Sequence, residues 1–312
     1  MTTRSDYFVS TYAWIEKPLQ ETVAELVEGG WKAVEIMCEG RHGELLEWSE
    51  ERLDWLKQIG QYNGISWTLH APITGCNPAS SDAEVIRDSS NVLHRTLQIA
   101  EKLGCAYVVV HPGEREEQSY TKSGNDQHES DQGGADEREN ENENENVKSG
   151  TVQAWSDRGG SVDEAANRVV LFLQEALKAT EGYGVTIALE NVPPYPGLLG
   201  ADPAFLKHVV QRVGSPRVRI VFDVGHAHLT GKSRCLLALQ YLLPYVISLH
   251  LSDNQGEHDD HLRLGAGTVP LEGVLALTRQ FQYSGSWVLE LRSLSDVVAS
   301  VRWLEQRRTG IA

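Results

Sequence analysis

Imidazole and carboxylate side chains recur in this chain directly after short apolar runs. Mixed nitrogen and oxygen donors suit Zn²⁺, Mn²⁺, Co²⁺ or Fe²⁺ better than Ca²⁺, which prefers oxygen ligands alone. If the fold brings these positions together, they form a centre for one to three divalent metal ions. The positions are Glu35, His70, His111, Glu190, Asp223, His250 and Glu290, with His226, Asp259 and His261 a short distance along the chain.

Each of these residues also has an ordinary interpretation. A single His or Glu after an apolar run is commonly a hydrogen-bonded or exposed side chain. The set is harder to explain in that way, because ionisable groups crowded together cost desolvation and repulsion unless a cation offsets them. We therefore interpret the set as metal ligands. Of the remaining histidines, His228 and His258 are near enough in sequence to support the ligands from outside.

The apolar runs alternate with amphipathic stretches of helical periodicity, which predicts a parallel sheet covered by helices. Capping boxes predict helix starts at Ser81 and Ser161, and the pair Asp202-Pro203 predicts another. Eight runs predict an α/β protein with a closed (β/α)8 TIM barrel, in which all strand carboxyl ends face one side. The predicted strands span residues 7–11, 33–36, 66–69, 106–110, 185–189, 217–222, 246–251 and 286–289.

One connection is about twice as long as the others. Successive ionisable residues lie 27 to 41 positions apart, except for the 79 between His111 and Glu190. The excess coincides with residues 114–150, a low-complexity stretch with twelve acidic residues and too few apolar ones to offset the entropy lost on ordering. We predict a single TIM-barrel domain over residues 1–312, with a disordered acidic insertion in the fourth βα loop. The insertion is either a lid or a neutral expansion.

Composition narrows the class of protein. A net charge of −16 weighs against non-specific nucleic-acid binding, which depends on Lys and Arg, although a local basic groove is not excluded. No apolar run reaches the roughly 18 residues of a membrane span, and the N-terminus lacks the long apolar region of a secretory signal. The four cysteines are scattered without a pairing pattern. These features predict a cytoplasmic protein with no membrane partner and leave open whether it forms a homo-oligomer.

Several motifs resemble those of a known superfamily, the xylose isomerase-like TIM barrels, which holds sugar isomerases and epimerases together with endonuclease IV. The resemblance runs from about residue 7 to residue 304, with the insertion left out, and looks closest to the sugar phosphate isomerase/epimerase group. The order and spacing of the motifs are specific for the superfamily, but fold and metal site do not fix the reaction. The motifs read LHAP, VVHPGE, ALEN, FDVGHAHLTG, LHLSDNQGEHDDHLRLGAGTVP and VLEL.

The resemblance implies two ligand schemes. Similarity to the epimerases implies one divalent ion, with Glu190 and Glu290 also flanking the substrate carbon whose proton moves. Similarity to endonuclease IV implies three zinc ions, and all nine positions carry the required residue type. The single ion of the epimerase scheme and the second ion of the three-zinc scheme have the same ligands, which are Glu190, Asp223, His250 and Glu290. The first of the three takes His70, His111 and Glu190, and the third takes His226, Asp259 and His261.

Departures from endonuclease IV favour the isomerases. The loop after His70 lacks that family's aromatic residue, and the loop after Glu35 lacks an Arg-rich wedge, both of which a base-flipping enzyme needs. The leading hypothesis is a metal-dependent isomerase or epimerase of a small sugar, sugar phosphate or polyol ketone, in which the two glutamates exchange protons through an enediolate.

Glu35, Trp14 and Arg292 are candidate substrate-binding residues, although Trp14 can be loop packing and Arg292 can pair with Asp296. The second hypothesis is a three-metal phosphodiesterase acting on abasic DNA. A non-catalytic binding module is the third, and the complete ligand set argues against it.

Overall fold

A computed structural model of the protein describes residues 7–115 and 161–309. Eight parallel strands form a closed barrel in sequence order, and β8 pairs with β1 to complete it. The predicted (β/α)8 barrel is confirmed, with every strand within two residues of its predicted bounds. The strands are β1 (Phe8–Ser10), β2 (Ala33–Met37), β3 (Ser66–His70), β4 (Tyr107–Val110), β5 (Thr186–Glu190), β6 (Val218–Asp223), β7 (Val246–Leu251) and β8 (Ser286–Leu289).

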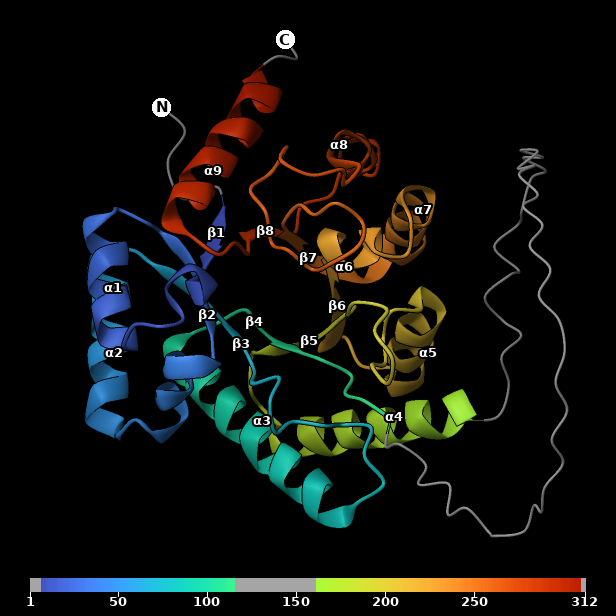
Figure 1. Cartoon of the computed structure of the whole chain (residues 1–312). Helices are drawn as coiled ribbons and strands as arrows, with labels where there is room; N and C mark the ends of the chain where they lie inside the picture. The colour runs from blue at the N-terminus through green and yellow to red at the C-terminus, as the bar shows by residue number, and fades with distance from the viewer. Residues whose placement is uncertain (1–6, 116–160, 310–312) are drawn as a thin grey trace, which may run out of the picture.

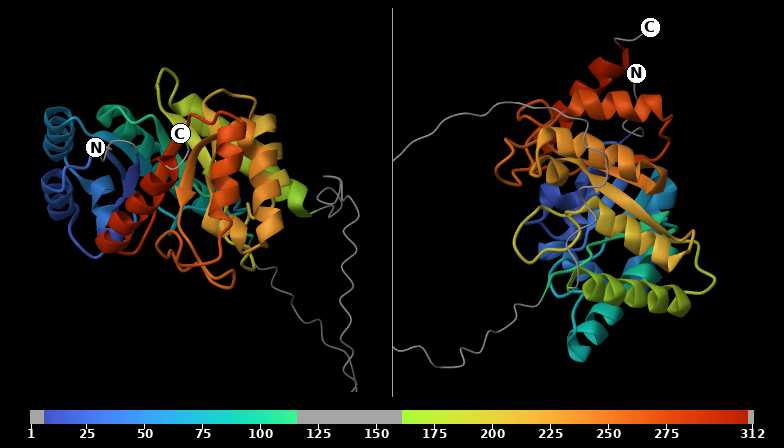
Figure 2. Two further views of the ribbon diagram at one scale, coloured as in Figure 1. Left: turned by 90° about the horizontal axis from the view of Figure 1, so that it is seen from above. Right: turned by 90° about the vertical axis from the view of Figure 1, so that its right-hand side faces the viewer.

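Helices surround the barrel, and the last helix α9 lies beside β1 (Figures 1 and 2). Short 3-10 helices follow β1 and β2 and precede β7. The α-helices are α1 (Leu19–Glu28), α2 (Glu50–Asn63), α3 (Ala83–Leu103), α4 (Ser161–Ala179), α5 (Pro203–Val213), α6 (Val224–His228), α7 (Lys232–Leu242), α8 (Leu271–Gln280) and α9 (Leu294–Thr309). The 3-10 helices are η1 (Thr11–Trp14), η2 (Gly40–Glu47) and η4 (Leu243–Tyr245).

The helix starts test the capping predictions. Asp202 caps α5, where its Oδ1 accepts the amide of Ala204 at 2.8 Å, as predicted. The cap of α3 is Asp82 rather than the predicted Ser81, because its Oδ1 accepts the amides of Glu84 and Val85. A carboxylate at this position also interacts favourably with the positive end of the helix dipole. The side chain of Ser161, the other predicted cap, lies outside the described residues.

The side chains of the strands alternate between two layers of core. Val34 and Ile36 on β2 belong to the large apolar cluster between sheet and helices, so Glu35 between them points into the barrel. The barrel interior holds a small second cluster made of Tyr107, Val109, Ala188 and Val221. All four cysteines are described, and each is a buried free thiol.

The start of the predicted insertion belongs to the folded barrel. Glu114 forms an antiparallel bridge with Leu198, and the amide of Arg115 donates to the carbonyl of Gly197 at 2.8 Å. Asn77 accepts the amide of Glu114 at 3.0 Å. The insertion therefore begins after these two residues, and the rest of the predicted stretch, 116–150, lies outside the described residues. None of the described helices is long and apolar enough to span a membrane.

Candidate metal centre

The predicted ligands meet at the carboxyl ends of the strands. His70, Glu190 and Asp223 are the last residues of β3, β5 and β6, and His250 is the second-last residue of β7. Glu290 directly follows β8. These five residues are at most 6% exposed. Residues separated by more than two hundred positions therefore share one buried site.

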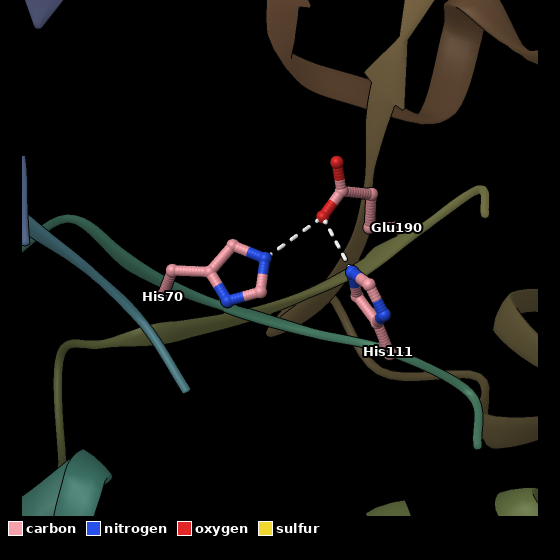
Figure 3. Close-up of side chains that lie close together, drawn as sticks. All are labelled: His70, His111 and Glu190. Atoms are coloured by element: carbon pink, nitrogen blue, oxygen red, sulfur yellow. Dashed lines mark hydrogen bonds and ion pairs between the residues drawn. The ribbon is translucent and has the colours of Figure 1, made fainter. Parts of the chain in front are cut away.

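The first group joins two histidines through one carboxylate (Figure 3). Nε2 of His70 lies 3.0 Å from Oε2 of Glu190, and Nε2 of His111 lies 3.2 Å from the same oxygen. The two imidazole rings meet edge to face with centroids 5.2 Å apart. This is the first ligand set that the resemblance implied.

The second group contains three carboxylates and one imidazole. Oε1 of Glu190 and Oε2 of Glu290 each lie 2.9 Å from Nδ1 of His250. Asp223 completes the group, and one ligand atom from each of the four residues lies within 4.8 Å of all the others. Glu190 belongs to both groups, so its two oxygens face different neighbours.

The third group lies on the loop after β7 and the short helix after β6. Nε2 of His226 is 3.2 Å and Nε2 of His261 is 3.0 Å from Oδ2 of Asp259. All three ligand sets that the resemblance implied are thus assembled among the described residues.

Three of the histidines are oriented by backbone carbonyls. The Nδ1 atoms of His70, His226 and His261 lie 2.7, 2.8 and 2.9 Å from the carbonyl oxygens of Ala71, Asn191 and Glu290. A carbonyl oxygen only accepts, so each Nδ1 carries a proton, and in the neutral imidazole, the form that binds a metal, each Nε2 keeps its lone pair. Nε2 is the atom that faces the carboxylate in all three cases, which is the arrangement of a metal-binding histidine.

The charges in the site shift the pKa values of its groups strongly. Burial raises the pKa of Asp223 to about 6; His226 lowers this pKa, and Glu190, Asp259 and Glu290 raise it further. Burial would lower the pKa of His261, but the hydrogen bond to Asp259 and the charges of Glu290, Asp259 and Asp223 together raise that pKa to about 9. Burial would likewise raise the pKa of Glu190, yet His250, His111 and His70 hold it well below its usual value.

The donor set fits a divalent cation. One buried atom of each residue in the second group has no hydrogen-bond partner among the described residues: Glu190 Oε1, Asp223 Oδ2, His250 Nδ1 and Glu290 Oε2. Buried carboxylate oxygens without a hydrogen bond are costly, and a cation bound between them satisfies their lone pairs and their charge. Nitrogen and oxygen donors together suit Zn²⁺, Mn²⁺, Co²⁺ or Fe²⁺.

The loop that carries Asp259 and His261 is held from several sides. Buried Asp253 accepts the amides of Asn254, Gly265 and Val269 at 2.9 to 3.0 Å. His261 has a φ of 49°, a strained value for a non-glycine residue that the surrounding contacts must enforce.

Three side chains outside this loop also fix it. Nε2 of buried His228 lies 3.0 Å from the Thr268 hydroxyl. The Tyr195 hydroxyl accepts the amide of Asp259 at 3.0 Å. The Arg292 guanidinium donates to the carbonyls of Asp260 and Asp259, at 2.9 and 3.2 Å.

The three predicted substrate-binding residues occupy different places. Glu35 is fully buried beneath the ligands, with Oε1 3.3 Å from Nε2 of His250. Trp14 is buried in the apolar core, and its indole N–H donates to Glu25 at 2.8 Å. Arg292 is exposed at the mouth and is engaged with the loop carbonyls.

Tyr12 also lies at the site, although it was not predicted from the sequence. Its ring lies 5.0 Å from the ring of His261 and 5.9 Å from the Arg292 guanidinium carbon. Tyr12 follows the end of β1, so the rule that selected the other site residues, position after a strand end, would also have found it.

Comparison with known proteins places this site in a family. The model of the xylose isomerase-like TIM barrels matches residues 23–141 and 145–307. The chain belongs to this family. It is 26% identical over 299 residues to a Methanocaldococcus jannaschii protein named "Uncharacterized protein MJ1311", covering 96% of this chain and 87% of that one.

Two further relatives bear on function. A Thermotoga sp. protein named "Probable endonuclease 4" is 26% identical over 261 residues, covering 78% of this chain and 75% of the relative. A solved structure titled "D-tagatose 3-epimerase-like protein" matches with a TM-score of 0.76 and 25% identity, covering 96% of both chains. The chain is thus similar to two proteins whose names refer to different activities.

Proposed function

We propose that this protein is a divalent-metal-dependent isomerase or epimerase of a small sugar, sugar phosphate or related polyol ketone. The observation that carries the proposal is the pair Glu190 and Glu290, whose buried carboxylates both reach the same nitrogen of His250 at 2.9 Å. Two carboxylates that face one centre provide an acid and a base around a single substrate carbon. Similarity to the "D-tagatose 3-epimerase-like protein" supports a sugar as the substrate.

Glu190, Asp223, His250 and Glu290 would hold the metal ion. A bound divalent ion polarises neighbouring carbonyl and hydroxyl oxygens and so lowers the pKa of the carbon acid between them. One glutamate then removes the proton from the carbon next to the carbonyl, which gives an enediolate. The other glutamate returns a proton, to the opposite face in an epimerase or to the neighbouring carbon in an isomerase.

The environment of both glutamates suits this exchange. Burial would raise the pKa of Glu290, but His250 and His261 together lower it; the pKa of Glu190 is lowered as well. A lowered pKa keeps a carboxylate ionised at neutral pH, as the glutamate that acts as the base must be. Their exposure of 1% and 6% keeps bulk water away from a reactive enediolate.

The mouth of the barrel favours a small substrate over a DNA duplex. The Glu39 carboxylate accepts the amides of Ile73 and Thr74, which ties the loop after β2 to the loop after β3. A carboxylate thus occupies the rim where a DNA-binding relative would place a wedge or a phosphate contact. Negative charge at this position opposes the approach of a phosphate backbone.

A second candidate function has its own support. The three complete ligand groups exceed the single ion that an epimerase requires, and the chain is similar to a "Probable endonuclease 4". Three ions would suit a phosphodiesterase that acts on abasic DNA by activating water and stabilising the leaving oxygen. One tightly bound ion per chain favours the isomerase, and three favour the hydrolase.

The test is a direct comparison of the two substrates. Purified protein is loaded with Zn²⁺, Mn²⁺ or Co²⁺ and assayed against a panel of ketoses, aldoses and their phosphates, with a duplex containing an abasic site as comparator. The proposal predicts turnover of at least one sugar, abolished in Glu290→Gln, and no cleavage of the duplex. Cleavage of the abasic duplex without sugar turnover would contradict the isomerase proposal.

A further inference from the structure

Glu35 lies one layer below the ligands. In the register of the barrel Glu35 pairs with Thr68, whereas Met37 pairs with the ligand His70. Two residues along a strand correspond to roughly 6–7 Å. Glu35 is 0% exposed, so its carboxylate lies too deep to contact a substrate at the mouth.

His250 is oriented differently from the histidines described above. His70, His226 and His261 face the carboxylates with Nε2 and use a backbone carbonyl for Nδ1. His250 instead faces Glu190 and Glu290 with Nδ1 and points Nε2 into the barrel. Inside a barrel the strand carbonyls are used by the ladder, so an acceptor for this Nε2 has to come from a side chain.

Glu35 is placed to be that acceptor. Its Oε1 lies 3.3 Å from Nε2 of His250, and neither atom makes a hydrogen bond of regular geometry to any described residue. Its Oε2 accepts from the Thr68 hydroxyl at 3.3 Å. A fully buried carboxylate with one neutral donor is costly, and an N–H on Nε2 of His250 would be a further donor within 3.3 Å.

We propose that Glu35 is a positioning residue that takes the Nε2–H of His250 and thereby fixes the tautomer whose Nδ1 lone pair faces Glu190 and Glu290. The inference rests on the proposed metal site and deepens it. A carboxylate on the outer nitrogen also makes the inner nitrogen a better ligand. Glu35 therefore acts through His250 and not through the substrate.

Glu35→Gln tests the proposal, because glutamine keeps the size of the side chain and removes its charge. We expect the affinity for Zn²⁺, measured by competition with a chromophoric chelator, to fall roughly 10–100-fold, as for other outer partners of metal-binding histidines. The thermal midpoint of the metal-free variant is expected to equal or exceed that of the wild type, since a buried charge is removed. Thr68→Val, which removes only the hydroxyl bonded to Glu35, is the matched control and should change the affinity much less.

A second measurement needs no variant at position 35. In zinc-loaded wild-type protein the ¹⁵N signals of His250, identified by their loss in His250→Gln, should show a proton on Nε2 and none on Nδ1. A proton on Nδ1, or a Glu35→Gln variant with unchanged zinc affinity, would overturn the proposal. Neither readout uses turnover, so a protein that binds zinc in this way but converts no sugar would refute the proposed function alone.

Discussion

At the residue scale, the sequence could predict which side chains form the site but not how each one faces it. Residue type and position after a strand end were sufficient to select His70, Glu190 and Asp223, because parallel strands in a barrel end on one side. The choice between Nδ1 and Nε2 depends on acceptors such as the Ala71 carbonyl, which sequence spacing does not reveal. The depth of Glu35 was missed because β2 continues to Met37, one residue beyond its predicted end.

His250 gives the first prediction. His250→Ala removes one of four ligands and also leaves Glu190, Glu290 and Glu35 without the imidazole between them. We expect metal affinity to fall by more than the roughly 10–100-fold that loss of an outer partner costs. The measurement is elemental analysis of the purified protein after dialysis against a weak chelator.

His94 supplies the control for that prediction. It lies within α3 and contacts Gln98, away from the three ligand groups. His94→Ala should retain the metal content of the wild type. A wild-type protein that takes up no metal even after reconstitution would remove the premise of the site.

At the element scale, the loop after β7 is the part of the site that depends most on tertiary contacts. Its ligands Asp259 and His261 lie on a segment without regular structure, and Arg292, Tyr195 and Asp253 fix its path. The motif predicted its ligands, but the contacts that hold it come from other loops. The bounds of the strands could be predicted more accurately than the path of this loop, because apolar β-branched runs identify buried parallel strands by themselves.

Arg292→Ala is the second prediction. It removes two hydrogen bonds to the carbonyls of Asp259 and Asp260, each contributing about 1 kcal/mol. We expect roughly a tenfold or greater loss of affinity at the third ligand group, detected as less metal per chain by mass spectrometry. Arg279→Ala, on the exposed surface of α8, is the control. If metal content is unchanged and KM for a sugar phosphate rises instead, Arg292 binds substrate, as predicted from the sequence.

His42 gives a prediction about acid stability. It is buried in η2 and contacts the hydroxyls of Thr11 and Thr22, and burial lowers its pKa to about 4. In the unfolded chain this imidazole protonates near pH 6.5, so the unfolded state binds more protons between pH 6.5 and 4. The stability contributed by neutral His42 is present above pH 6.5 and is lost as the pH falls toward 4.

The comparison with His42→Gln isolates this group. The difference in free energy of unfolding between wild type and variant should move in the variant's favour by on the order of 3 kcal/mol from pH 7 to pH 4. Urea denaturation at both pH values measures it. A difference that is independent of pH would show that His42 titrates alike in the folded and unfolded chain.

At the scale of the whole molecule, closure of the barrel brings the residues of the site into contact. Glu190 on β5 and Glu290 after β8 are a hundred residues apart in sequence and contact the same atom of His250 on β7. Periodicity and the count of eight strands predicted this convergence. The choice among reactions could not be predicted in the same way, because one barrel with one ligand set supports both proton transfer and hydrolysis.

The most direct test of the proposed proton transfer is turnover in D2O. A sugar converted through an enediolate should take up deuterium at the carbon next to the carbonyl, because the glutamates exchange their protons with solvent. Glu290→Gln keeps the size of the side chain and an oxygen ligand but removes the base, so it should abolish labelling more completely than it reduces metal content, and Glu190→Gln should do the same. Product that forms without deuterium would contradict the account, since a hydride shift moves the hydrogen internally.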